Sequence, residues 1–160
     1  MIAQVKEWLR ENGKLEENIQ TVFKVVRVND KGEYRPALSG NVELRERIVY
    51  TPGDYYKVGE NFQYPAFAFH DEVCARNFIY MITEGLDIPP LAVMSFVAYQ
   101  WTWLEKYLFI TLIPNKTHME RFWSSTRPFD HTCPMSATNT TPHGTIGLFE
   151  FDVGDVIYGG

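Results

Sequence analysis

Apolar residues recur with two different periods along this chain, and the period changes near residue 21. The first period is helical and is set by four residues, Ile2, Val5, Trp8 and Leu9. Asn12 and Gly13 follow, and this pair is typical of a helix end. The pattern predicts a short amphipathic helix at the start of the chain.

Beyond residue 21, β-branched and aromatic residues dominate, and this composition favours strands. Residues 22–28 and 33–38 flank the turn composition of residues 29–32, so we expect a hairpin. Pro36 has no amide hydrogen to donate to a ladder, so the second strand should be short or lie at an edge.

The rest of the chain predicts further strands around one helix. We expect strands at residues 43–50, 64–69, 91–99, 107–113, 145–151 and 155–158, the last two separated by Gly154. In residues 43–50 Leu44 and Ile48 also suit a helix, and we favour the strand. Asp71 suits the N-cap of the helix and Gly85 its C-cap. Residues 91–99 and 107–113 should lie at the centre of the sheet, and residues 114–142 should form a long loop.

Together these elements predict one α+β domain over residues 1–160. Its sheet is twisted, mainly antiparallel and has about six or seven strands, with an N-terminal helix and one helix packed on the sheet. A length of 160 residues suits one core. The residues expected to be buried there are Val25, Phe78, Ile82, Val93, Phe96 and Ile110.

The charge balance narrows the classes of partner. The formal charge is −5, and residues 58–160 carry five basic and eleven acidic side chains. Nucleic-acid binding is therefore unfavourable, because it depends on clustered Lys and Arg, whereas an uneven charge distribution favours protein partners. Two cysteines are too few for a disulfide scaffold. Charged residues interrupt both the first twelve positions and the apolar stretch 91–114, so we predict a cytoplasmic protein without a membrane segment.

Aromatic residues make up 15% of the chain, and all except Trp8 lie at or after Phe23. Six of them fall in expected connections or strand ends: Tyr55, Tyr56, Trp101, Trp103, Phe122 and Trp123. Each one alone fits the edge of a core, but together they are typical of an interaction surface. We therefore predict a small non-enzymatic module that binds a protein partner through aromatic-rich loops, and a second copy of the chain is one candidate partner.

Trp101 and Trp103 are two residues apart, so in a strand they should share a face. Two adjacent indoles form an apolar patch that needs a cover. We expect either the N-terminal helix or another chain to supply it.

One set of positions in the first half of the chain forms a pattern: Phe23-Lys24-Val25-Val26-Arg27, Gly32, Tyr34, Val49-Tyr50, Gly53, Phe67-Ala68-Phe69, Asp71, Ala75 and Phe78. This pattern resembles small uncharacterised α+β domains of phage, giant-virus and bacterial proteins. The resemblance implies a hairpin followed by a strand–helix unit, and a viral or mobile-element origin. No assigned activity comes with it.

A second resemblance leads to the alternative function. Arg27, Ser124-Ser125-Thr126 and Glu150-Phe151-Asp152 follow one another in that order. They resemble the strand Arg, the Ser-Thr-Ser segment and the Glu-x-Glu pair of ADP-ribosyltransferases, although Ser-Ser-Thr and Asp152 depart from that pattern. The resemblance implies NAD as cosubstrate and catalytic roles for Arg27, Ser125 and Glu150, in which Arg binds pyrophosphate and a carboxylate stabilises ribose. The same residues also fit exposed strand and loop positions.

Two further groups have the residue types of reactive sites. The donors that suit zinc are His131, Cys133 and His143, with His118 or Asp130. Their spacing matches no zinc module, so we expect a polar loop and no bound metal. Cys74 lies four residues after His70, a spacing that suits a nucleophile and its base at the start of one helix. Its apolar helical neighbours favour a small core residue instead. For the binding module we expect no cofactor.

Overall fold

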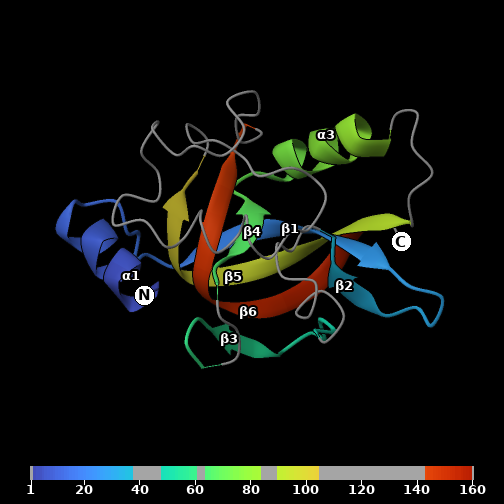
Figure 1. Ribbon diagram of the computed structural model, residues 1–160. Helices are drawn as coiled ribbons and strands as arrows, with labels where there is room; N and C mark the ends of the chain where they lie inside the picture. Colours follow the sequence, from blue (N-terminus) through green and yellow to red (C-terminus); the bar gives the residue numbers. More distant parts are fainter. Residues whose placement is uncertain (1, 38–47, 61–63, 84–89, 105–142, 160) are drawn as a thin grey trace.

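The computed structural model describes residues 2–37, 48–60, 64–83, 90–104 and 143–159, which form two helices and a six-stranded sheet (Figure 1). In chain order these elements are α1 Ile2–Glu11, β1 Gln20–Val28, β2 Tyr34–Pro36, β3 Tyr55–Lys57, β4 Ala66–Phe69, α3 Glu72–Thr83, β5 Leu91–Trp103 and β6 Thr145–Gly159. The predicted α+β class, the N-terminal helix and the first hairpin are confirmed.

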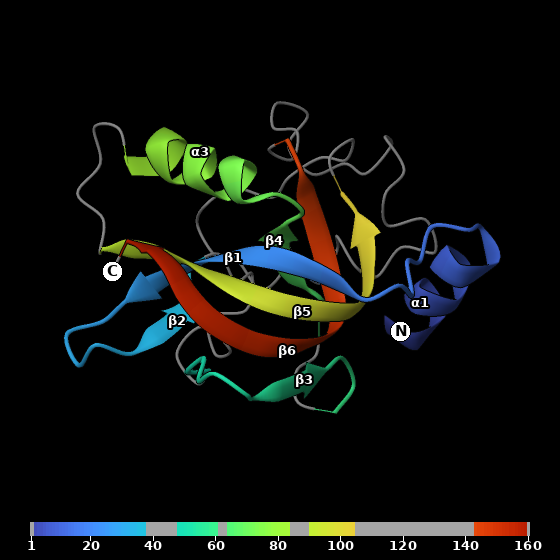
Figure 2. The ribbon, with the colours of Figure 1, turned by 180° about the vertical axis from the view of Figure 1, so that it is seen from behind.

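Four of the strands pair in a closed ring. β1 pairs with β4 and β5, and β6 pairs with the same two strands, all antiparallel. β2 extends the sheet beside β1, and β3 extends it beside β6. Figure 2 shows β1, β5 and β6 as long curved strands with β3 along the lower edge. The sheet therefore has an inner face, enclosed by the ring, and an outer face.

The inner face holds the larger apolar core. Phe96 of β5 and Phe151 of β6 stack with ring centroids 5.0 Å apart, and Tyr50 meets Phe96 edge-on at 5.0 Å. The other buried members are Val22, Val26, Ala68, Ala92, Met94, Ala98, Trp101, Ile146, Leu148 and Val153. Because side chains alternate along a strand, every second residue of β1 enters this core.

A second core lies between the outer face and α3. Val25 and Val93 from the strands pack with Ala75 and Phe78 of the helix. The Phe69 ring lies tilted against the Phe78 ring, with centroids 5.2 Å apart. The predicted burial of Val25, Phe78, Val93 and Phe96 is confirmed. The side chains of Ile82 and Ile110, also expected in the core, lie outside the described part of the chain.

Helix α3 begins directly after Asp71, as predicted. The amide of Ala75 donates to the Asp71 carbonyl at 3.2 Å, which is the first bond of the helical ladder. Arg76 pairs with Glu72 at 2.7 Å and lies 4.2 Å from the centre of the Tyr158 ring. This cation–π contact attaches the helix to the end of β6. The predicted cap at Gly85 lies outside the described residues.

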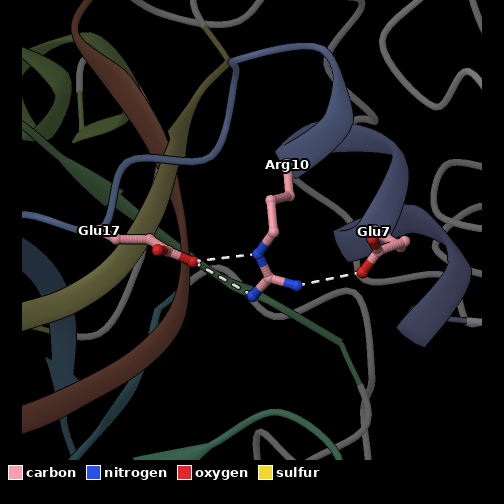
Figure 3. Close-up of polar contacts among 3 residues, drawn as sticks. All are labelled: Glu7, Arg10 and Glu17. Atoms are coloured by element: carbon pink, nitrogen blue, oxygen red, sulfur yellow. Dashed lines mark hydrogen bonds and ion pairs between the residues drawn. The ribbon is translucent and has the colours of Figure 1, made fainter.

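Helix α1 is attached to the rest of the molecule by burial and by ion pairs. Val5 and Leu9 are buried. The guanidinium of Arg10 pairs with Glu7 and with Glu17, each at 3.1 Å (Figure 3). These three side chains are exposed, so the pairs add little to stability. The helix ends as predicted before Gly13, whose φ of 67° suits a residue without a Cβ.

Two of the expected strand boundaries are wrong. β5 continues through Trp103, so Trp101 and Trp103 lie in a strand and not in a connection. β6 continues through Gly154, where its backbone comes very close to that of β5. A Cβ at this position would lie 2.2 Å from the carbonyl oxygen of Ser95 in β5. Glycine marks a close approach of two backbones here rather than a turn.

The strand expected over residues 43–50 is absent from its described end, residues 48–50. Tyr50 makes a backbone bond to the Tyr34 carbonyl at 2.8 Å without forming a ladder. Residues 43–47, the strand expected at residues 107–113 and the long loop lie outside the described ranges. The predicted central position of residues 91–99 is confirmed, since β5 lies between β1 and β6.

Candidate functional site

Two tyrosines on the outer face of the sheet donate their hydroxyls to carboxylates of β6. The Tyr55 hydroxyl, from β3, donates to Glu150 Oε2, and the Tyr99 hydroxyl, from β5, donates to Asp152 Oδ2. The bonded residues are 95 and 53 positions apart in the sequence, so only the folded sheet brings them together. We call Tyr55, Tyr99, Glu150 and Asp152 the tyrosine–carboxylate surface.

The register of β3 against β6 places the first pair. Tyr55 is opposite Asp152 and Lys57 is opposite Glu150, so alternate residues of both strands share the outer face. Tyr55 therefore reaches its diagonal neighbour Glu150 rather than the residue opposite to it. Such diagonal pairs lie within reach of a long aromatic side chain.

A β-bulge in β5 places the second pair. Ala98 and Gln100 are opposite the consecutive residues 150–151 of β6, which leaves Tyr99 between them as an extra residue. An extra residue in one strand re-aims its side chain. Here the side chain of Tyr99 lies beside Asp152 on the outer face.

Both tyrosines have a phenol pKa above that of an isolated tyrosine. The hydrogen bond to Glu150 is the main cause that raises the pKa of Tyr55 to about 12. The hydrogen bond to Asp152 is the main cause that raises the pKa of Tyr99. A phenol that donates to a carboxylate must keep its proton, so both hydroxyls are neutral donors at neutral pH.

The charge around this surface is mainly negative. The charged groups that affect the pKa of Tyr55 are all carboxylates, those of Glu60, Glu150 and Asp152. Basic groups lie close to it. Burial and the nearby charge of Lys57 lower the pKa of Lys6 of α1, and Glu150 acts on Lys6 in the opposite direction. The surface thus has carboxylates next to Tyr55, with Lys57 opposite Glu150 and Lys6 of α1 close to both.

Tyr56, which we expected in the same binding set, points to the inner face. Its ring stacks on Phe151 at 5.4 Å and meets Tyr50 edge-on at 5.9 Å. Tyr56 packs against the core enclosed by the ring of strands, because neighbouring residues of a strand point to opposite faces. Tyr55 is the more exposed residue of this pair, with 42% of its surface exposed, and Tyr56 is half-buried.

Trp101 and Trp103 lie side by side, as their spacing predicts, with ring centroids 5.4 Å apart. His70, directly after β4, lies 4.7 Å from the Trp103 ring and 5.5 Å from the Trp101 ring. Trp101 is covered within its own chain: its indole donates to the Asn18 carbonyl at 3.3 Å, and its backbone pairs with Glu16. The cover is the segment that follows α1, and Trp103 keeps 37% exposure.

The residues of the transferase alternative do not meet in the described structure. Arg27 is opposite Leu91 at the start of β5, whereas Glu150 is opposite Gln100. At about 3.3 Å per residue, these positions are roughly 30 Å apart along the strand. Ser125, and the expected binding residues Phe122 and Trp123, lie outside the described residues.

In the described part of the chain, no group of three or more His, Cys, Asp or Glu side chains is placed to hold a metal ion. His118, Asp130, His131 and Cys133 lie outside this part. Cys74 packs against the second core and against Gly144, where an added Cβ would lie 2.8 Å from Sγ. This supports the interpretation of Cys74 as a small packing residue.

Sequence reasoning missed one residue, Lys24. Its side chain is 1% exposed, and its Nζ donates to the Phe67 carbonyl at 2.6 Å. Burial lowers its pKa to about 7. The signal was present in the sequence, because Lys24 alternates with Val22 and Val26 and so shares their inward face.

Comparison with family models, with curated proteins and with solved structures found no match to this chain. In the described residues, neither helix has the length and apolar character needed to span a bilayer.

Proposed function

We propose that the protein is a non-enzymatic binding module that engages a protein partner through the tyrosine–carboxylate surface. The observation that carries this proposal is the fixed position of two tyrosines, each held by a carboxylate on an outer face where Tyr55 remains 42% exposed. Tyrosine offers a large contact area with few rotatable bonds, and a held hydroxyl reduces the entropy lost on binding.

The charge of the surface supports a partner that presents basic side chains. Carboxylates surround Tyr55, and an arginine could stack on the phenol ring while it pairs with Glu150 or Asp152. Electrostatic attraction of this kind raises association rates and disfavours acidic partners. Lys57 and Lys6, close to these carboxylates, would restrict the direction from which a basic segment approaches.

Three finer predictions belong to this proposal. A protein partner is favoured over nucleic acid because phosphates would meet the carboxylates of the surface. A cytoplasmic location and a viral or mobile-element origin stay predictions from the sequence. A second copy of the chain is one form of the partner, and light scattering on the purified protein distinguishes it from a monomer.

The transferase stays an untested alternative that no described residue favours. It requires Arg27 and Glu150 in one cleft, whereas their positions lie far apart along β5. A rise in the unfolding midpoint with NAD, together with turnover lost in Glu150→Gln, would replace the binding module by the enzyme.

A library of random displayed peptides, selected on the immobilised protein, tests the proposed function. We expect enrichment of peptides rich in Lys and Arg, with binding that weakens as salt is added. The variant Tyr55→Ser should lose this binding, and Glu150→Gln should weaken it.

The matched control is Tyr80→Ser, because Tyr80 is also an exposed tyrosine, 68% exposed, but lies on α3. It should bind the selected peptides as the wild type does. Peptides that bind the Tyr55→Ser variant equally well, or enrichment of acidic peptides, would contradict the proposal.

A further inference from the structure

The ring is closed at one narrow seam between β1 and β4. β1 pairs with β5 along residues 20–27, and β5 pairs with β6 along residues 92–103. Between β1 and β4 the described ladder has a single paired position, Phe23 opposite Phe69. Few backbone bonds therefore hold this seam, and it is the place where the ring is easiest to open.

Lys24 spans this seam from the inside. It follows Phe23 on β1, and its Nζ donates to the carbonyl of Phe67 on β4 at 2.6 Å. The side chain adds one bond between the two strands next to their single backbone pair. Its position opposite Met94 confirms that it points to the inner face, since Met94 belongs to the core inside the ring.

The described surroundings of Lys24 on the inner face are apolar. β4 contributes Ala68, β5 contributes Met94 and β6 contributes Ile146 to this core. The titratable side chains in and against this core are Tyr50, Tyr56 and Tyr34. Burial raises the pKa of the Tyr50 and Tyr56 phenols, so both remain neutral. Burial is also the cause that lowers the pKa of Lys24, and no carboxylate among the described residues offsets it.

We propose that Lys24 is a pH-sensitive closure of the β1–β4 seam, in which the neutral amine keeps the ring closed and protonation of the amine favours an open seam. In the closed ring a protonated amine is a charge in an apolar interior with one carbonyl as its partner. When the seam opens, water reaches the amine and the charge is solvated. The open form therefore binds the proton more tightly than the closed form.

The direction of the pH effect follows from this difference. The amine has a pKa of about 7 in the closed ring and 10.5 when it is solvated. Between these two values the open form carries more protons, so lowering the pH favours opening. The equilibrium constant for opening rises about tenfold for each pH unit lowered within this window, and it is level below it.

Native-state hydrogen exchange tests the closure, at pH 7.5 and pH 9 and after correction for the intrinsic exchange rate. β4 stays paired with β6 when the seam opens. We therefore expect the β4 amides that face β1 to be less protected than those paired between β5 and β6, because the seam opens separately. The opening of β4 should be roughly 30-fold more frequent at pH 7.5 than at pH 9. In Lys24→Met, which has a neutral side chain of similar volume, this dependence should vanish.

Three outcomes would overturn the proposal. β4 protection that does not change with pH would mean that its opening leaves Lys24 buried. Equal protection of β4 and of the β5–β6 ladder would mean that no separate seam opening exists. If Lys24→Met does not fold, ¹⁵N NMR of the wild-type lysine amines decides: a Lys24 amine that titrates near pH 10.5 contradicts the account, and one near pH 7 supports it.

Discussion

Tyr55 and Tyr56 are neighbours in β3, yet they face different surroundings. Tyr56 stacks on Phe151 in the core of the ring, whereas Tyr55 lies on the outer face and donates to Glu150. The same alternation continues in β6, where Phe151 points inward and Asp152 outward. Because side chains alternate between the two faces of a strand, one of these two tyrosines packs in the core and the other makes an exposed polar contact.

This difference between the faces predicts how substitutions divide. On the inner face a substitution should change stability, because it leaves a cavity or a charge inside the ring. On the outer face it should change binding, because the side chain is partly in water. Substitutions of Lys24 test the expectation for the inner face, and substitutions of Tyr55 test the expectation for the outer face.

The largest expected effect comes from the stacked aromatics of the inner face. Phe96→Ala should destabilise the protein by about 3–5 kcal/mol, because Phe96 is fully buried and its truncation leaves a cavity inside the ring of strands. Urea denaturation measures this change. Ile157→Ala is the control on an exposed position of β6, and we expect less than about 1 kcal/mol there. Equal losses for both variants would contradict the division of the two faces.

The next effect is the pH dependence that Lys24 gives to global stability. The folded pKa of about 7 lies below the value of 10.5 for a solvated lysine, so the unfolded chain binds more protons between these values. Stability should therefore rise with pH in this window, by about 1.4 kcal/mol per pH unit at most. Urea denaturation at pH 7 and pH 9 should show a gain of about 2–3 kcal/mol in the wild type and none attributable to this residue in Lys24→Met.

A smaller loss is expected where β5 and β6 come close together at Gly154. Gly154→Ala places a Cβ 2.2 Å from the Ser95 carbonyl oxygen, so one of the two strands must move. We expect a loss of about 1–3 kcal/mol, which is typical of overpacked sites. Thermal unfolding measures it. Gly53→Ala reports backbone strain without contact, since Gly53 has a φ of 92° and an added Cβ there meets nothing within 4 Å. An unchanged midpoint for Gly154→Ala would show that β6 does not run as described.

The smallest change in stability is expected at Tyr55 itself. Tyr55→Phe removes the hydroxyl from a partly exposed ring, and the free energy of unfolding should change by less than about 0.5 kcal/mol. In the wild type the phenol should still be protonated at pH 10.5, because Glu150 raises its pKa to about 12. NMR of labelled tyrosine rings follows this titration. Glu150→Gln should lower the pKa, and a Tyr55 that titrates near 10 in the wild type would mean that the bond to Glu150 is not formed.

The elements set by local pattern were predictable from the sequence. The alternation over residues 22–28 and the turn composition after it gave the hairpin, and Asp71 marked the start of α3. The extension of β5 and the continuity of β6 were missed, because Gly154 resembles a strand break unless its close contact with Ser95 is known. That contact joins residues far apart in the sequence, and no local pattern reports it.

The candidate site was predictable only in part for the same reason. The sequence indicated Tyr55 as an anchor, but its partner Glu150 was assigned to a different site. Tyr99 was assigned to an ordinary strand end, because the bulge that turns it outward depends on the register with β6. Lys24 could have been found from its alternation with apolar residues, but its acceptor, the Phe67 carbonyl, is 43 residues away.

The most direct test of the division between the faces is the pair of variants Tyr55→Ser and Tyr56→Ser, measured for stability and for binding of the selected basic peptides. Tyr56→Ser should destabilise the protein by about 2–3 kcal/mol and, while folded, still bind the peptides. The free energy of unfolding of Tyr55→Ser should be within about 0.5 kcal/mol of that of the wild type, and this variant should lose the binding of the peptides. Equal destabilisation by the two variants, or binding that survives Tyr55→Ser, would contradict the account.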